Sequence, residues 1–265
     1  MPVQMSGLSA LHKIVGKKDS QFSSWSGGEI LATAIVLNQR TTLVHRFALF
    51  SGVSLSDCGS IVSGAREKSL SRRQTVFAEG DPVRQISLVL SGCVKLTQFG
   101  QDGTEVILRL TGPGEIVGAL GLNPESGHSS TAQTMEASVL LVWELAAFES
   151  VLERHALLRR NLFRILEGRL QEMDERFREV STERVAPRLS SQLVRLLNQV
   201  GKRVNGEVEL SLSRSELAQL TGTTLFTVSR LLCQWELRGI VSAGRESVLV
   251  RDLPALMDLS RGVVE

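Results

Sequence analysis

The sequence predicts an α+β chain with an N-terminal antiparallel β-barrel, one long helix and a C-terminal winged helix-turn-helix. Three observations carry this prediction. Between Glu67 and Glu144, short apolar runs alternate with glycine turns. Between His155 and Thr182, apolar residues recur every three or four positions, which is a helical period. The stretch from Arg214 to Cys233, RSELAQLTGTTLFTVSRLLC, then has the pattern of two helices joined by a tight turn.

The length of 265 residues allows two ordinary domains, and 42% hydrophobic with 22% charged residues is typical of a globular chain. Residues 1 to about 40 are weakly patterned and include the loop-like SSWSGG at 23–28. We therefore expect four parts. They are a flexible extension over 1–44, a barrel over 45–153, the long helix over 154–182 and a helix-turn-helix domain over 183–265.

The barrel prediction rests on strands of about five to seven residues at near-regular spacing, a pattern typical of sandwiches and barrels. Turn sequences such as Glu79-Gly80-Asp81-Pro82 and Gln101-Asp102-Gly103 separate these strands. A short helical segment around Phe47 to Leu55 precedes them. The strands are expected at 75–78, 86–90, 94–99, 106–110, 129–135 and 139–143.

The long helix carries a narrow apolar stripe. The stripe consists of Phe163, Leu166, Leu170, Met173, Phe177 and Val180, at spacings of 3, 4, 3, 4 and 3 residues. Such spacing is typical of the seam of a two-stranded coiled coil, so it predicts a homodimer. The alternative is an amphipathic helix that lies on its own barrel. A helix of about 28 residues is about 42 Å long, enough to join two domains and to pair with its twin.

The helix-turn-helix pattern depends on three positions. Ala218 is small enough for the two helices to touch, Gly222 takes the positive φ of the turn, and β-branched Val228 fills the crook between the helices. Ser213 and Glu216 make a capping-box pattern before the first helix. A second helix over 225–237 would then lie in the major groove of double-stranded DNA. The alternative, a helical hairpin inside a core, fits the same apolar residues.

The segment IVSAGRESVLV at 240–250 predicts a β-hairpin wing, with Arg245 at its tip to touch the DNA backbone. Ser229 and Arg230 are expected to project from the first half of the second helix, where a serine and an arginine can reach phosphate and guanine. Trp235 and Leu237 are expected to close that helix onto a core. The candidate DNA-binding residues are Thr224, Phe226, Thr227, Ser229, Arg230 and Arg245.

Several function classes have no support in the sequence. Cys58, Cys93 and Cys233 lie far apart and form no CxxC pair, so we predict no metal, no cofactor and a reducing cytoplasm. No run of 18 apolar residues suggests a membrane span, and the polar N-terminus does not suggest a secretory signal. There is no P-loop or catalytic triad order, so we predict that the protein is not an enzyme.

The order of barrel, long helix and winged helix resembles the Crp/Fnr superfamily of bacterial transcription regulators. The resemblance covers about Phe47 to Leu259. It rests on FAEGDP at 77–82, Ser91-Gly92, PGEIVGALGL at 113–122 and TVSRLLCQWELRGIV at 227–241. It implies a jelly-roll, cyclic-nucleotide-binding-like sensor barrel, a dimer helix that transmits the signal, and a winged helix that binds a palindromic promoter site, with RNA polymerase as a further partner.

The barrel departs from the members of that family that bind cyclic AMP. Those members look like GELGL, whose glutamate holds the ribose, followed by an Arg-Ser pair that holds the phosphate. Here Ala119 stands at the glutamate position and His128 at the arginine position, before Ser129. We therefore expect a degenerate pocket that does not bind cyclic AMP tightly. Its candidate residues are Gly118, Ala119, Leu120, His128 and Ser129.

Other signals stay open. His128 or His155 would be the ligand in a haem sensor, and one of the three cysteines would serve a redox switch, although Cys233 is expected on the inner face of its helix. An effector-free regulator is a further alternative. So is a ligand-binding module whose main role is to take a cyclic nucleotide or another small effector. The absence of cysteine before Cys58 removes the N-terminal iron–sulfur sensor of the oxygen-sensing branch.

The second helix departs from the family as well. The branch with Ser-Arg at this place usually carries a glutamate three residues before the serine, where it accepts from cytosine. Here the residue is Phe226, whose ring cannot accept a hydrogen bond but can pack on a thymine methyl. We predict a half-site that keeps one G·C contact through Arg230 and differs at the neighbouring base pair.

Overall fold

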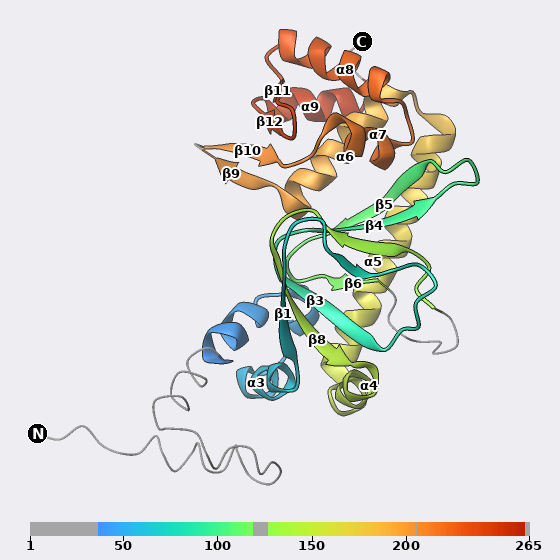
Figure 1. Cartoon of the computed structure of the whole chain (residues 1–265). Coiled ribbons are helices and arrows are strands. Elements are labelled where there is room, and N and C mark those ends of the chain that lie inside the picture. The colour runs from blue at the N-terminus through green and yellow to red at the C-terminus, as the bar shows by residue number, and fades with distance from the viewer. Residues whose placement is uncertain (1–36, 119–126, 205, 263–265) are drawn as a thin grey trace, which may run out of the picture.

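The computed structural model describes residues 37–118, 127–204 and 206–262. A barrel forms one end of the molecule, a helical domain forms the other, and one long helix runs alongside both (Figure 1). This confirms the predicted α+β class and the order of its parts.

Two four-stranded antiparallel sheets form the barrel, with strand orders β1-β8-β3-β6 and β2-β7-β4-β5. The first sheet contains β1 (Arg66–Leu70), β3 (Gln85–Ser91), β6 (Ile116–Val117) and β8 (Ser138–Glu144). The second contains β2 (Thr75–Phe77), β4 (Val94–Phe99), β5 (Glu105–Thr111) and β7 (Thr131–Thr134). The sequence pattern missed β1 and β6, because neither has a bounded apolar run: β1 reads REKSL and β6 has two residues.

Alternation along the strands builds two apolar layers. Val89, Leu140 and Val142 face Val94 and Leu96 between the sheets. Their neighbours on the first sheet point the other way, toward helices that cover its outer face. Those helices are η2 (Ala48–Phe50), α3 (Leu55–Ser63), α4 (Leu145–Arg154) and the start of α5 (Ala156–Thr182).

The described part of the predicted flexible extension is ordered. Residues 37–44 are helical, and Val44 is fully buried in the core beneath the first sheet. Arg40 pairs with Glu67 of β1 at 2.6 Å. Tertiary contacts therefore hold residues 37–44 on the barrel, although the sequence pattern of this segment is weak. Residues 1–36 lie outside the described part of the chain.

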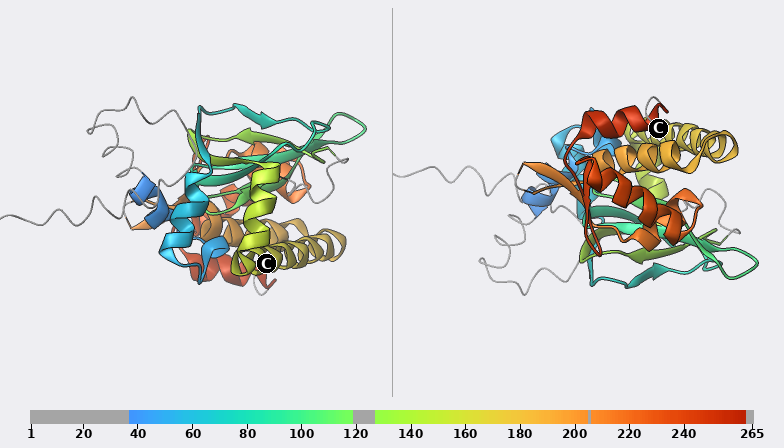
Figure 2. Two further views of the ribbon diagram at one scale, coloured as in Figure 1. Left: turned by 90° about the horizontal axis from the view of Figure 1, so that it is seen from below. Right: turned by 90° about the horizontal axis from the view of Figure 1, so that it is seen from above.

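Helix α5 confirms the predicted long helix and runs past the barrel to the other domain (Figures 1 and 2). Three arginines in and after this helix point into the molecule. Arg169 donates to the Ile116 carbonyl of β6, Arg176 to the carbonyls of Leu108 and Leu220, and Arg188 of α6 to that of Thr221. These carbonyl groups, which belong to distant segments of the chain, are acceptors that no sequence pattern reveals.

The C-terminal domain packs four helices on a small sheet of order β11-β12-β10-β9. Its elements are α6 (Val185–Val200), β9 (Lys202–Val204), β10 (Glu207–Leu210), α7 (Arg214–Thr221), α8 (Leu225–Leu237), β11 (Val241–Ala243), β12 (Val248–Val250) and α9 (Leu253–Ser260). Cys93, Ile107 and Leu110 of the barrel belong to the same apolar cluster as this domain. The two domains therefore share a core along β5 and beside Cys93, which precedes β4.

Candidate nucleic-acid interface

The turn between α7 and α8 has the geometry that the sequence predicts. Gly222 lies in the left-handed region with φ 60° and ψ 47°, a conformation that other residues rarely adopt. Ala218 and Val228 are buried between the two helices. Ser213 and Glu216 form a capping box, in which the serine accepts from the glutamate N–H and the glutamate accepts from the serine N–H. These contacts fix the angle at which α8 leaves the domain.

Helix α8 begins at Leu225, as predicted, and exposes its first turn. The Phe226 side chain is 85% exposed, which is unusual for a phenyl ring on a packed domain. Arg230 is also exposed and lies one turn further along. Thr224 caps the helix by accepting from the Thr227 N–H at 3.2 Å, and the two threonine hydroxyls lie 3.0 Å apart. An apolar ring and a guanidinium are therefore presented on one helix face.

Two expectations for α8 are wrong. Leu237 is 90% exposed, whereas Trp235 is buried as predicted. Cys233 is exposed and does not lie on the inner face. The helical period explains why both side chains are exposed. Cys233 lies about 140° around the helix from buried Val228, and Leu237 lies about 200° from buried Trp235. The exposed thiol stands on the helix proposed to bind DNA.

The predicted wing is present as β11, β12 and the turn between them. The end of β11 next to the turn is held by Arg214, which donates to the Ala243 carbonyl at 3.2 Å, and by Glu236, which accepts from the Ala243 N–H at 3.2 Å. Arg245 is exposed at the tip. The neighbouring Glu246 makes an ion pair with Arg72 of the barrel at 3.0 Å. The turn of the wing is thus held by contacts within the C-terminal domain and by one exposed ion pair to the barrel.

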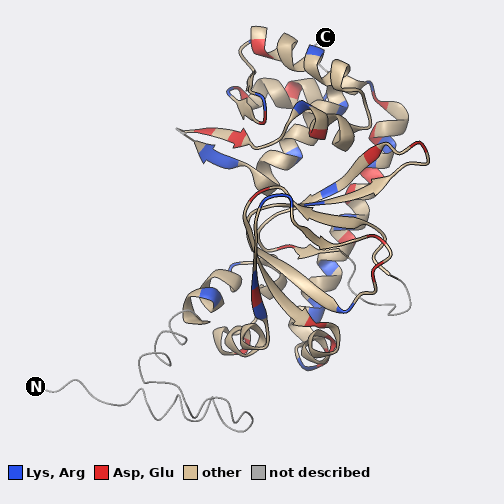
Figure 3. Ribbon diagram, in the orientation of Figure 1, with Lys and Arg blue, Asp and Glu red and all other residues tan. Residues whose placement is uncertain are grey.

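Basic and acidic residues are spread over both domains and do not form a single block (Figure 3). This matches the formal net charge of +2. An anion-binding surface on this protein therefore depends on the local arrangement of its basic side chains and not on its net charge.

The predicted seam of α5 faces solvent in the single chain. Leu170 is 60% exposed and Phe177 is 76% exposed, and Phe163, Met173 and Val180 are also exposed. Leu166 is half-buried. The side of the helix that faces the rest of the chain is held by Arg169, Arg176 and the Glu179–Arg195 ion pair at 2.6 Å. The alternative in which the stripe packs on the chain's own barrel is therefore wrong.

The candidate effector pocket is partly filled by the chain itself. The Phe77 ring stacks on His128 with centroids 3.5 Å apart and an interplanar angle of 8°. A Cβ atom at Gly118 would overlap the Phe77 ring. His128 is 5% exposed, and burial lowers the pKa of its imidazole, opposed by the charge of Asp81. Ala119 and Leu120 lie outside the described residues, and Ser129 is exposed next to His128.

A cavity of about 230 Å³ remains beside this stack. Lys68, Ser87 and Val142 line it from the first sheet, with Phe77 and His128 on the other side. The His128 Nδ1 atom is buried and has no hydrogen-bond partner. The stacked imidazole of His128 therefore forms part of the cavity wall.

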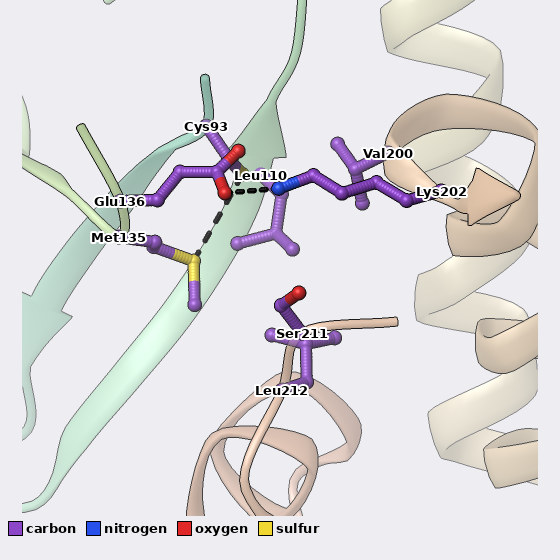
Figure 4. A pocket seen from close by; sticks show the side chains of 8 residues that line it. All are labelled: Cys93, Leu110, Met135, Glu136, Val200, Lys202, Ser211 and Leu212. Atoms are coloured by element: carbon purple, nitrogen blue, oxygen red, sulfur yellow. Dashed lines mark hydrogen bonds and ion pairs between the residues drawn. The ribbon is translucent and has the colours of Figure 1, made fainter. Parts of the chain in front are cut away.

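A smaller pocket of about 30 Å³ lies where the domains meet (Figure 4). Lys202 of β9 pairs there with Glu136 of the barrel, and the Cys93 thiol lies 3.9 Å from the Met135 sulfur. Burial, then the charges of Glu136 and Glu115, raise the pKa of Cys93 to about 12. Burial, then the charge of Asp57, raise that of Cys58 to about 11. Both thiols are protonated near neutral pH, which disfavours them as redox switches.

Within 37–118, 127–204 and 206–262, no three His, Cys, Asp or Glu side chains come together as metal ligands. None of the helices in these ranges is both long and apolar enough to span a bilayer. Sequence reasoning missed Arg72, Arg176 and Arg214, whose partners come from distant parts of the chain. No local signal marks them.

Two family models match the chain. A cyclic nucleotide-binding domain matches residues 67–155, and a Crp-like helix-turn-helix domain matches residues 187–259. The "Cyclic AMP receptor protein" of Thermus thermophilus is 30% identical over 216 residues, which is 81% of this chain and 97% of the relative. The "CRP-like cAMP-activated global transcriptional regulator" of Mycobacterium tuberculosis is 27% identical over 83% of this chain and 99% of its own.

The solved structure of FixK2 from Bradyrhizobium japonicum has a similar fold. It aligns with a TM-score of 0.65 at 22% identity, over 74% of this chain and 96% of that one. At this identity the likeness concerns the fold. It matches the barrel, long helix and helix-turn-helix order described above.

Proposed function

This chain belongs to the Crp/Fnr family of transcription regulators, and from this premise we propose that it acts as a homodimer that binds palindromic promoter DNA. One observation carries the proposal. An exposed helix face with Phe226 and Arg230 stands on a helix-turn-helix whose turn is fixed by Gly222. We propose RNA polymerase as the partner at the promoter, the cytoplasm as the location, and no catalytic role.

Dimerisation is supported by the exposed stripe on α5. Exposed apolar side chains that repeat along one helix face are costly in water unless a partner covers them. Their 3,4 spacing fits a second copy of the same helix, because it keeps one seam in register over the helix length. Two copies of α8 then face the same side of the dimer, as an inverted repeat in DNA requires.

For base contacts we propose a division of labour along α8. Arg230 donates to guanine, and the Phe226 ring packs on a thymine methyl. Ser229, Thr227 and Thr224 lie beside them to contact phosphate, and Arg245 of the wing adds a backbone contact. Phe226→Glu should restore a preference for cytosine at the neighbouring base pair. Selection of bound sequences by wild type and variant tests this, and identical half-sites would refute it.

We propose that the barrel does not bind cyclic AMP tightly, although two relatives are named for that nucleotide. The support is the stacked Phe77–His128 pair in place of a permanent cation. Calorimetry with cyclic AMP and with cyclic GMP should give no heat. Saturable binding would favour the second candidate function, a ligand-binding module, for which the cavity beside His128 is the specific observation.

The proposed mechanism is a shift between two dimer populations. Active and inactive dimers differ in how the two α5 helices pack, and hence in the distance between the two copies of α8. Arg176 supports such coupling, because one guanidinium from α5 contacts a carbonyl of β5 and one of α7. A signal acts only if it has different affinity for the two states.

A further inference from the structure

The inner face of the first barrel sheet changes from apolar to polar along its length. Strands β1, β8 and β3 lie side by side in this sheet (Figure 1). Lys68 of β1 pairs with Leu140 of β8, and Ser87 of β3 pairs with Val142. The two β8 residues belong to the apolar layer between the sheets, and residues paired across strands point to the same face. Lys68 and Ser87 therefore point into the barrel, where the inner face of a packed sheet is ordinarily apolar.

The cavity of about 230 Å³ beside the Phe77–His128 stack occupies this polar region. Two polar side chains in its wall are more than nine-tenths buried, since His128 is 5% exposed and Ser87 is 7% exposed. Neither the His128 Nδ1 atom nor the Ser87 hydroxyl has a hydrogen-bond partner among the described residues. Buried polar groups in proteins are almost always hydrogen-bonded. Two unsatisfied groups in one wall are what a site for a polar ligand requires.

Two cations approach the cavity from its two ends. Lys68 is half-buried, and Arg84, just before β3, is exposed at the rim. Neither side chain has a hydrogen bond or ion pair with any residue in the described ranges. Lys68 is level with Leu140 of β8. Gln85, next to Arg84, is level with Glu144, four residues further along the same strand. At about 3.3 Å per residue, the two cations leave the backbone about 13 Å apart along the strands.

The charge of the lining is positive. Asp81 is the acidic side chain that lines the cavity, and its carboxylate accepts from the Ala78 N–H at 2.8 Å. Burial lowers the pKa of His128, so its ring is neutral near pH 7. Lys68 and Arg84 against Asp81 leave a net charge of +1. An anion is therefore favoured over a neutral molecule or a cation of the same size.

We propose that this cavity binds a short aliphatic dicarboxylate, with one carboxylate at Lys68 and the other at Arg84. Ser87 lies between the two cations along the sheet and supplies a hydroxyl donor. Val76 and Val142 line the cavity and suit the aliphatic middle of such a ligand. The inference rests on the second candidate function, because it names the class of ligand that the barrel takes.

The size of the cavity fits this class. Its volume of about 230 Å³ equals about eight water molecules at about 30 Å³ each. Pockets for drug-sized ligands have about 300–1,000 Å³, so a whole cyclic nucleotide is too large for the space. A short dicarboxylate fills it and places a charge at each end.

Calorimetry with the full chain tests the inference. Succinate, glutarate and adipate differ only in the distance between their carboxylates. Glutaramide carries neutral amides instead, butyrate has one carboxylate, and phosphoglycolate has a phosphate at one end. We expect saturable binding of at least one dicarboxylate, at least about tenfold weaker binding of butyrate, and no binding of glutaramide, because each charge-assisted contact contributes about a factor of ten or more.

Three variants test the residues. Lys68→Gln and Arg84→Gln should each weaken dicarboxylate binding about tenfold or more, and Ser87→Ala should weaken it about two- to tenfold. Arg46→Gln is the matched control, because Arg46 is exposed and does not line the cavity, and it should bind like wild type. Because Arg84 is exposed, Arg84→Gln keeps the test available if Lys68→Gln does not fold.

No heat with any dicarboxylate would overturn the inference. So would glutaramide that binds as tightly as glutarate, or binding that neither Lys68→Gln nor Arg84→Gln weakens. Binding of phosphoglycolate without any dicarboxylate would keep the ligand-binding role of the barrel and refute the ligand class. Failure of the proposed DNA-binding function looks different, because the protein would then not bind operator duplexes, whatever the calorimetry shows.

Discussion

Replacing Leu170 by glutamate should separate the proposed dimer. Leu170 is 60% exposed in the single chain and lies in the middle of the α5 stripe. Full burial of a leucine contributes about 1.5–3 kcal/mol, so covering 60% of it contributes about 1–2 kcal/mol per protomer and about 2–4 kcal/mol for the pair. Losing that term alone raises the dimer dissociation constant about 30- to 700-fold. Two carboxylates facing each other across the seam add repulsion to this loss.

Sedimentation velocity over a concentration series measures the change, and fluorescence anisotropy with a palindromic duplex measures its consequence. Leu157→Glu is the matched control, because Leu157 is an exposed leucine on the same helix but lies about 140° around it from Leu170. We expect the control to remain dimeric and to bind DNA. A Leu170→Glu protein that stays dimeric and binds with wild-type affinity would refute the reasoning.

Three further predictions concern single side chains. Arg230→Ala should cost about 1–3 kcal/mol of operator binding and relax specificity at one base pair, which binding to a set of singly substituted duplexes measures. Arg176→Gln should leave the dimer intact but raise the rate of amide hydrogen exchange in α7. The reason is that two charge-assisted hydrogen bonds of about 1.5–3 kcal/mol each are lost. The control Arg178→Gln, on the same helix, should change neither dimerisation nor hydrogen exchange in α7. Burial lowers the folded-state pKa of His128, so the unfolded chain binds the proton more readily. Stability should therefore be complete above the unfolded pKa of about 6.5 and fall as the pH drops below it, and denaturant titrations of wild type and His128→Gln at pH 7.5 and 5.5 should show the loss only in wild type.

Local rules account for much of the DNA-binding domain. Gly222 is needed for a left-handed turn, Ser213 and Glu216 satisfy each other's backbone groups, and the period of α8 places Val228 inside. The same period predicts the exposed stripe of α5, since a 3,4 repeat puts Leu170 and Phe177 on one face. Each of these depends on residues a few positions apart, which a sequence displays directly.

Contacts between segments that lie far apart in the sequence could not be predicted from such local patterns. Arg72 and Glu246 are 174 positions apart, and neither has a neighbour that marks it as paired. The helix at 37–44 is held by burial of Val44 rather than by its own pattern. His128 differs from the family pattern in the sequence, but its stacking on Phe77 depends on how two loops meet. The sequence predicts that the pocket lacks a phosphate-binding arginine, and the structure shows the rings of Phe77 and His128 stacked at this place.

The most direct test of a dimeric regulator that reads DNA through α8 is selection of bound duplexes from a random pool by the purified full chain. The account predicts an inverted repeat whose half-sites lie about one helical turn apart, roughly 34 Å or a multiple of it, with a G·C pair that Arg230→Ala no longer requires. Enrichment of no sequence, or of a single half-site whose selection does not change in Arg230→Ala, would contradict it.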